Sequence, residues 1–120
     1  MAFFSKLFSK SFKSISAARA REMLDDGAVL VDVRTSSEWN AGHAPVARHV
    51  PLDTLDRRAS SLNRETPIVL ICKSGMRSAQ AARMLAAQGH TVASVRGGMF
   101  AWQRSGEKVI AKNGKEGTVA

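Results

Sequence analysis

The sequence predicts an α/β fold built on a parallel sheet, and three observations support this prediction. Patterns typical of helices and strands alternate between residues 16 and 104, as they do where crossover helices connect parallel strands. Residues 29–33 are apolar except for Asp32, as expected of a strand that is buried on both faces. At 120 residues the chain has the size of one domain, which can bury about two thirds of the surface exposed on unfolding.

Capping residues and stop signals predict the first half of this domain. Ser16 can cap a helix that runs to Leu24, and Gly27 can end it in a left-handed conformation. The strand over residues 29–33 follows. A second helix is predicted after Pro51, because the apolar residues keep helical spacing there. These residues are Leu52, Leu55, Ala59 and Leu62.

The second half continues the alternation. Residues 68–71 predict the central strand, residues 79–88 a helix that Gly89 ends, and residues 91–95 a further strand. A short closing helix is predicted over residues 99–104. The sequence contains no internal repeat and no sign of a second domain.

We divide the chain into three parts. Residues 1–14 are a basic amphipathic segment, residues 15–106 are the folded domain, and residues 107–120 are a polar C-terminal tail. Because the tail is rich in glycine and polar residues, we expect it to be loose.

The net charge of +8 is concentrated near the N-terminus. Residues 1–21 hold five Lys and Arg residues and no acid, whereas residues 22–105 hold ten against eight Asp and Glu. A domain so nearly balanced argues against a surface that follows nucleic-acid phosphates. We therefore expect no nucleic-acid partner.

The N-terminal segment has an amphipathic pattern, with apolar residues on one side of a helical projection and lysines on the other. The apolar residues are Phe3, Phe4, Leu7, Phe8, Phe12 and Ile15, and the lysines are Lys6, Lys10 and Lys13. A helix over residues 1–15 would suit an anionic membrane surface, or it would pack on the domain or on a second copy of the chain. A cleavable targeting peptide is disfavoured because the domain begins so soon afterwards.

The expected location is cytoplasmic, with peripheral contact at a membrane surface as the alternative. No apolar run approaches the ~18–20 residues of a membrane span. The single cysteine excludes an intrachain disulfide and is compatible with a reducing compartment.

That cysteine, Cys72, follows the central strand and begins a short polar loop. Ser78 is a suitable N-cap for the helix after the loop, so the loop amides and the helix dipole would favour a thiolate at Cys72. Gly75 permits a tight turn, and Arg77 adds a cation with several donors. The alternative is that Cys72 is a small buried apolar residue, as lone cysteines often are.

The loop resembles the active-site loop of the rhodanese superfamily, in which a cysteine and an arginine frame a short anion-binding turn. The resemblance covers residues 15–106 and includes further segments in the family's order. These are Asp32-Val33-Arg34, Glu38-Trp39, Gly42-His43, His49-Val50-Pro51-Leu52, and Gly97-Gly98 followed by Trp102. One departure is Val46, where the family usually has a glycine. The resemblance implies about five parallel strands with helices on both faces of the sheet.

Loop length distinguishes the chemistries of this superfamily. Four residues separate Cys72 from Arg77 here, whereas the related phosphatases have five and usually place a histidine where this chain has Ile71. The resemblance therefore favours sulfur transfer over phosphatase or arsenate reductase activity.

The implied mechanism is a relay through a persulfide on Cys72. Its thiolate takes sulfur from a donor such as thiosulfate and passes it to cyanide or a thiol. The substrate-binding residues would be those of the loop and the first helical position: Lys73, Ser74, Gly75, Met76, Arg77 and Ser78. A second cysteine is lacking, so the acceptor must come from outside, and it could be a sulfur-acceptor protein. A persulfide carrier with little turnover of small molecules is the alternative.

Four residues are expected to support the site structurally: Asp32, Arg34, Glu38 and His43. Asp32 and Arg34 would form an ion pair or hydrogen bonds at the sheet edge, and Glu38 would pair with a nearby arginine. The histidines are too scattered for a metal site, so we expect neither a metal nor a cofactor.

Overall fold

The computed structural model describes residues 11–120, and in them five parallel strands form one sheet in the order β1-β5-β4-β2-β3. The strands are β1 (Lys13–Ile15), β2 (Val29–Asp32), β3 (Arg48–His49), β4 (Ile68–Ile71) and β5 (Val92–Val95). The predicted α/β class and parallel sheet are confirmed. Within the described part of the chain, no helix is long and apolar enough to cross a bilayer.

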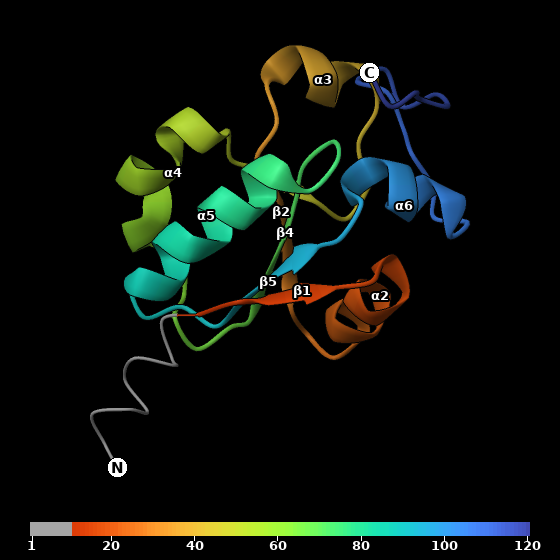
Figure 1. The fold of residues 1–120 in the computed structure, drawn as a ribbon. Helices are drawn as coiled ribbons and strands as arrows, with labels where there is room; N and C mark the ends of the chain where they lie inside the picture. The colour runs from red at the N-terminus through yellow and green to blue at the C-terminus, as the bar shows by residue number, and fades with distance from the viewer. Residues whose placement is uncertain (1–10) are drawn as a thin grey trace.

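Helices cover both faces of the sheet (Figure 1). The helical elements are α2 (Ala17–Asp25), α3 (Ser36–Ala41), α4 (Leu52–Arg58), the 3-10 turn η1 (Ala59–Ser61), α5 (Met76–Ala87) and α6 (Gly98–Arg104). Of these, α3 lies beyond the end of the strands (Figure 1) and buries none of its residues. All four residues of β4 are buried: Ile68 and Leu70 pack in the core beneath α4 and α5, whereas Val69 and Ile71 pack in the core beneath α2 and α6. This alternation explains why the strand is continuously apolar.

Several predicted boundaries hold and others shift. Ser16 caps α2 by accepting the Arg19 N–H at 3.0 Å, as predicted. The helix after Pro51 ends sooner than its apolar spacing suggested, because Leu62 is already extended. Val46 does not prevent its turn, which the Ala47 N–H closes by donating to the Ala44 carbonyl.

The N-terminal prediction was wrong where the structure describes it. Residues 1–10 lie outside the described residues, but Lys13–Ile15 form strand β1 at the sheet edge, in parallel with β5, and not a helix. Phe12 packs toward the core beneath α4 and α5, whereas Ile15 is buried in the core on the opposite face. Pairing with the otherwise open edge of β5 outweighs the local helical pattern.

The expectation of a loose C-terminal tail was also wrong. Ile110 forms antiparallel bridges with both His43 and Glu116, and the Thr118 N–H donates to the Ala41 carbonyl at 2.9 Å. Val109 is buried. The segment therefore lies against the end of α3, where Figure 1 places the C-terminus, and satisfies backbone groups that the helix leaves free.

Candidate active site

Cys72 lies directly after β4, at the carboxyl edge of the sheet, and its side chain is almost completely buried at 1% exposure. The backbone turns sharply at Gly75, whose φ of 114° favours glycine, and the Gly75 N–H donates to Cys72 Sγ at 3.1 Å. The sulfur therefore sits inside the turn that follows it.

Helix α5 begins at Met76 with Gly75 as its N-cap, so the prediction of Ser78 as the N-cap was wrong. Ser78 lies in the first helical turn and is buried. Because the left-handed Gly75 already makes the turn, the Ser78 hydroxyl is free to point toward the sulfur. The Cys72 thiol donates to Ser78 Oγ at 3.4 Å, and the same hydroxyl donates to the Gly75 carbonyl at 3.2 Å.

The surroundings of the sulfur favour the thiolate. Burial alone raises the pKa of Cys72, but hydrogen bonds from the Ser78 hydroxyl and from the backbone N–H groups of Ser78, Gly75 and Ser74 outweigh it, so the pKa lies below its usual value. The positive end of the α5 helix dipole also favours the thiolate. A lowered pKa is the property expected of a reactive cysteine.

Ser94 is a polar neighbour that the sequence analysis did not single out. It lies on β5, is buried, and its Oγ is 2.8 Å from Ser78 Oγ. Its only signal in the sequence is that it interrupts an apolar strand, which says nothing about the partner. The pairing of β4 with β5, in which Leu70 is opposite Ser94, brings it to the site.

Arg77 pairs with Glu38, which is the kind of partner expected for that carboxylate. The two guanidinium Nη atoms donate to the Glu38 oxygens at 2.7 and 2.8 Å, and so link α5 to α3. The Arg77 hydrogen bonds lower the pKa of Glu38 to about 2, with help from Thr35 and against the effect of burial. In the same way, Glu38 raises the pKa of Arg77.

Asp32 and Arg34 form a fully buried ion pair at the end of β2. Arg34 Nη2 donates to Asp32 at 2.8 Å and to the Gly42 carbonyl at 2.7 Å, while Nε also contacts the carboxylate. Among the described residues Arg34 Nη1 has no partner. The pair fixes the loop after β2 beside the Cys72 loop, since β2 is the direct neighbour of β4.

His43 belongs to an aromatic stack and does not reach the sulfur loop through any hydrogen bond described. Its ring lies 3.7 Å from that of Trp39, which also stacks on His49 at 4.8 Å. His43 Nδ1 is 2.6 Å from the Trp39 carbonyl. Within residues 11–120 no group of three or more His, Cys, Asp or Glu side chains could hold a metal ion.

The other loop residues differ in what they present to solvent. Met76 is 83% exposed, and Ser74 is exposed as well. The Lys73 ammonium lies 5.7 Å from the Phe100 ring, and therefore leans toward α6. A hollow of about 750 Å³ is lined by Arg77 together with residues that follow β2 and begin α4, such as Thr35 and Leu52.

The chain is similar over most of its length to known proteins. The chain is 34% identical over 100 residues to the thiosulfate sulfurtransferase GlpE of Actinobacillus pleuropneumoniae. The matched residues cover 82% of this chain and 93% of that relative. It is 37% identical over 90 residues to the putative sulfur carrier protein YrkF of Bacillus subtilis, covering 74% of this chain and 49% of that one.

A solved structure shares the architecture. The rhodanese-related protein of Thermoplasma volcanium superposes with a TM-score of 0.77 at 29% identity, over 84% of this chain and all of the other. Residues 16–105 match the Rhodanese-like domain family, and they contain the sheet edge, the Cys72 loop and both ion pairs around it. The chain therefore belongs to the rhodanese-like domain family.

Proposed function

We propose that this protein is a sulfurtransferase that carries sulfane sulfur as a persulfide on Cys72. The observation that supports it most directly is the environment of Cys72 Sγ, which accepts the Gly75 N–H at 3.1 Å and whose pKa lies below the usual value. The thiolate attacks the outer sulfur of a donor such as thiosulfate. The donor's sulfur–sulfur bond breaks, sulfite leaves with the electron pair, and the persulfide remains.

The loop is suited to stabilise each charged stage. Backbone N–H groups held in place by the Gly75 turn and the start of α5 need no reorganisation when negative charge develops. Lys73 and Arg77 add positive charge around the loop, although Glu38 already neutralises much of that of Arg77. The name of the relative from Actinobacillus pleuropneumoniae favours thiosulfate as the first donor to test.

A persulfide carrier is the second candidate. It is favoured by the name of one relative, the putative sulfur carrier protein. A carrier would form the persulfide quickly but release sulfur slowly to cyanide or small thiols. Pre-steady-state and steady-state rates, measured on one sample, separate the two candidates.

The experiment that tests the proposal is intact mass spectrometry of the wild-type protein and of Cys72→Ser after brief incubation with thiosulfate. We expect the wild type alone to gain the mass of one sulfur atom, and cyanide to remove it. Equal sulfur uptake or turnover by Cys72→Ser would overturn the proposal. Hydrolysis of an aryl phosphate by the wild type alone, without sulfur uptake, would indicate the phosphatase chemistry of the superfamily.

A further inference from the structure

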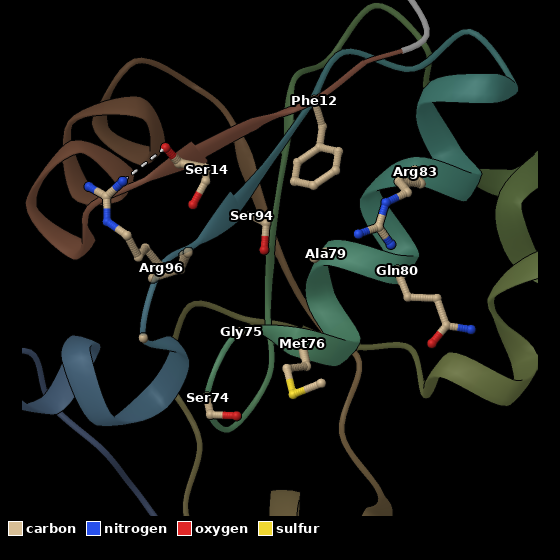
Figure 2. A pocket seen from close by; sticks show the side chains of 12 residues that line it. Phe12, Ser14, Ser74, Gly75, Met76, Ala79, Gln80, Arg83, Ser94 and Arg96 are labelled. Carbon is tan, nitrogen blue, oxygen red and sulfur yellow. Dashed lines mark hydrogen bonds between the residues drawn. The ribbon is translucent and has the colours of Figure 1, made fainter.

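The chain enters the domain at the amino edge of the sheet, away from the candidate site. Phe12 directly precedes β1, whereas Cys72 follows β4, and these strands run parallel within one sheet. Figure 2 shows the Phe12 ring at one end of a hollow of about 560 Å³ and the loop residues Ser74 and Met76 at the other. A partner bound at the entry of the chain is therefore held away from the Cys72 loop.

Exposed cations surround this entry point. Lys13 is the first residue of β1, and Arg83 Cζ, on α5, lies 5.7 Å from the centre of the Phe12 ring. Phe12 also lines a second hollow together with Gly89, and Arg64 Nε lies 3.5 Å from the position of a Cβ at Gly89. We call Lys13, Arg64 and Arg83 the entry surface.

The domain does not neutralise the charge of the entry surface. Within residues 11–120 none of its three cations forms an ion pair, and residues 1–10 contain no acid that could supply one. Two carboxylates of neighbouring elements are already bound, that of Glu22 by Arg19 at 3.0 Å and that of Asp56 by the Gln88 amide at 3.2 Å. Glu65 adds a single negative charge beside three positive ones, so the entry surface remains cationic.

The segment that leads into this surface has a charge of the same sign. Lys6 and Lys10 fall on one side of a helical projection, and the other side is apolar. The apolar side consists of Phe3, Phe4, Leu7 and Phe8. Like charges oppose packing of the segment on the entry surface of its own domain or of a second copy. Both features suit an anionic membrane, because a bilayer offers an apolar interior beneath its charged surface.

We propose that residues 1–10 and the entry surface attach this protein to an anionic phospholipid membrane. The phenylalanine side of the segment enters the boundary between headgroups and acyl chains, while Lys6, Lys10 and the entry surface contact the lipid phosphates. The attachment is peripheral and depends on charge, so salt weakens it. The Cys72 loop lies at the opposite edge of the sheet and stays clear of the membrane. This attachment is independent of the sulfurtransferase activity proposed above.

Co-sedimentation of the full chain with lipid vesicles tests the attachment. The vesicles contain phosphatidylcholine alone or phosphatidylcholine with phosphatidylglycerol, so that they differ in charge. We expect binding to the charged vesicles alone, reversed by high salt and lost when residues 2–10 are deleted, a change that leaves Phe12 and β1 in place. Binding to neither vesicle, equal binding to both, or undiminished binding of the deletion variant would overturn the inference. If the full chain bound no lipid and the deletion lowered its mass in solution, the segment would bind a second copy of the chain instead.

Single substitutions locate the contact on the protein. Lys10→Gln and Arg83→Gln should each weaken binding to the charged vesicles about fivefold, the contribution of one basic residue near an anionic surface. Arg104→Gln, on α6, and Lys112→Gln, in the C-terminal segment, remove the same charges from exposed positions away from the entry surface and should leave binding unchanged. Equal loss in all four variants would mean that net charge alone drives binding, and would overturn the assignment of the entry surface.

Two further measurements test how the bound protein is oriented. Phe8→Trp places an indole on the apolar side of the segment, and its emission, after subtraction of the wild-type signal, should shift to the blue when charged vesicles are added. Iodoacetamide should alkylate Cys72 at the same rate with and without those vesicles, because the loop faces away from them. Unshifted emission from sedimented protein would show adsorption by charge alone, and slower alkylation would place the Cys72 loop against the membrane. Either result would overturn the attachment as proposed.

Discussion

At the scale of single residues, the protonation state of Cys72 depends on which group receives the hydroxyl proton of Ser78. Ser78 has one proton to donate, and it can serve either the Gly75 carbonyl or a Cys72 thiolate. Ser94 Oγ is 2.8 Å away and can donate to Ser78 in turn. Such a donation leaves the Ser78 proton for the carbonyl or the sulfur, so Ser94 acts on the thiolate as a positioning residue through Ser78.

We expect Ser94→Ala to raise the pKa of Cys72 and to slow its reaction with iodoacetamide at neutral pH roughly threefold to tenfold, the effect of losing about one hydrogen bond. The measurement is the alkylation rate against pH, which reports the thiolate fraction. Ser60→Ala, at an exposed position on η1, is the matched control. An unchanged pH profile for Ser94→Ala would show that Ser94 only fills space.

Cys72 and its turn could be located from the sequence, but the hydroxyl partners of its sulfur could not. A strand, a cysteine and a glycine-bearing turn are local features, so Cys72 and Gly75 were identified directly. Ser78 was found, but its role was misassigned as an N-cap, because a serine near a helix start has two uses that the sequence does not distinguish. Ser94 becomes relevant only through the register of β5 against β4.

At the scale of elements, α3 is a short helix that is stabilised by polar contacts in its first turn. It buries none of its own residues. A capping box joins Thr35 and Glu38, and the same carboxylate binds Arg77 on α5. No apolar periodicity marked α3 in advance, because a six-residue helix without a buried face carries none. Its stability depends on these polar contacts and on the stacking of its Trp39 between two histidine rings.

The Glu38–Arg77 pair predicts a pH dependence of stability. Since the pKa of Glu38 falls from 4.5 to about 2 on folding, its contribution is complete above pH 4.5 and is lost as the pH falls toward 2. Urea unfolding midpoints of the wild type and Glu38→Gln should therefore differ at about pH 6, draw closer below pH 4.5 and converge only near about pH 2. Glu22→Gln removes an exposed carboxylate from α2 and should show little of this convergence. A difference independent of pH would rule out the ion pair as its source.

Helix α6 contacts the Cys72 loop through its first residues. The Met99 N–H donates to the Cys72 carbonyl at 2.8 Å, and Gly98 lies so close that an added Cβ would come within 2.6 Å of the Lys73 carbonyl carbon and oxygen. In the sequence, the Gly97-Gly98 pair is recognisable only as part of a family motif. The structure gives the physical reason, which is close packing of two backbones.

Gly98→Ala should displace the Cys72 loop and slow persulfide formation by about 100-fold, because a shift of about 1 Å at a reacting atom has effects of that size. The rate is measured by mass spectrometry of sulfur uptake from thiosulfate. Gly27→Ala is the control: it also places alanine at a positive φ, but nothing lies within 4 Å of the new Cβ. It should lower stability by about 1–2 kcal/mol without changing the rate of uptake by the folded protein. Equal rates in both variants would contradict the packing argument.

At the scale of the whole molecule, the C-terminal segment folds back onto the carboxyl edge of the sheet, where the candidate site lies. The C-terminal segment pairs with residues 41–43, and the Gly42 carbonyl there accepts Arg34 Nη2. The alternation of helices and strands predicted the sheet, but the composition of this segment predicted a loose tail. Composition describes local preference, whereas these contacts join residues far apart in the sequence.

The segment should therefore stabilise the domain as well as end it. Deleting residues 107–120 removes the buried Val109 side chain and the Arg21–Glu107 ion pair, and it uncovers Gly42, on which Thr118 packs. We expect a loss of about 2–4 kcal/mol in the free energy of unfolding, mostly from Val109 and the hydrogen bonds of the segment. Urea unfolding measures this loss of free energy. If the deletion variant does not fold, Val109→Ala offers a smaller loss that can be measured in its place. Lys112→Ala, at an exposed turn of the same segment, should have little effect. Unchanged stability in the deletion and in Val109→Ala would mean that the segment contacts the domain without stabilising it. The buried Asp32–Arg34 pair would then be held by β2 and its own loop alone.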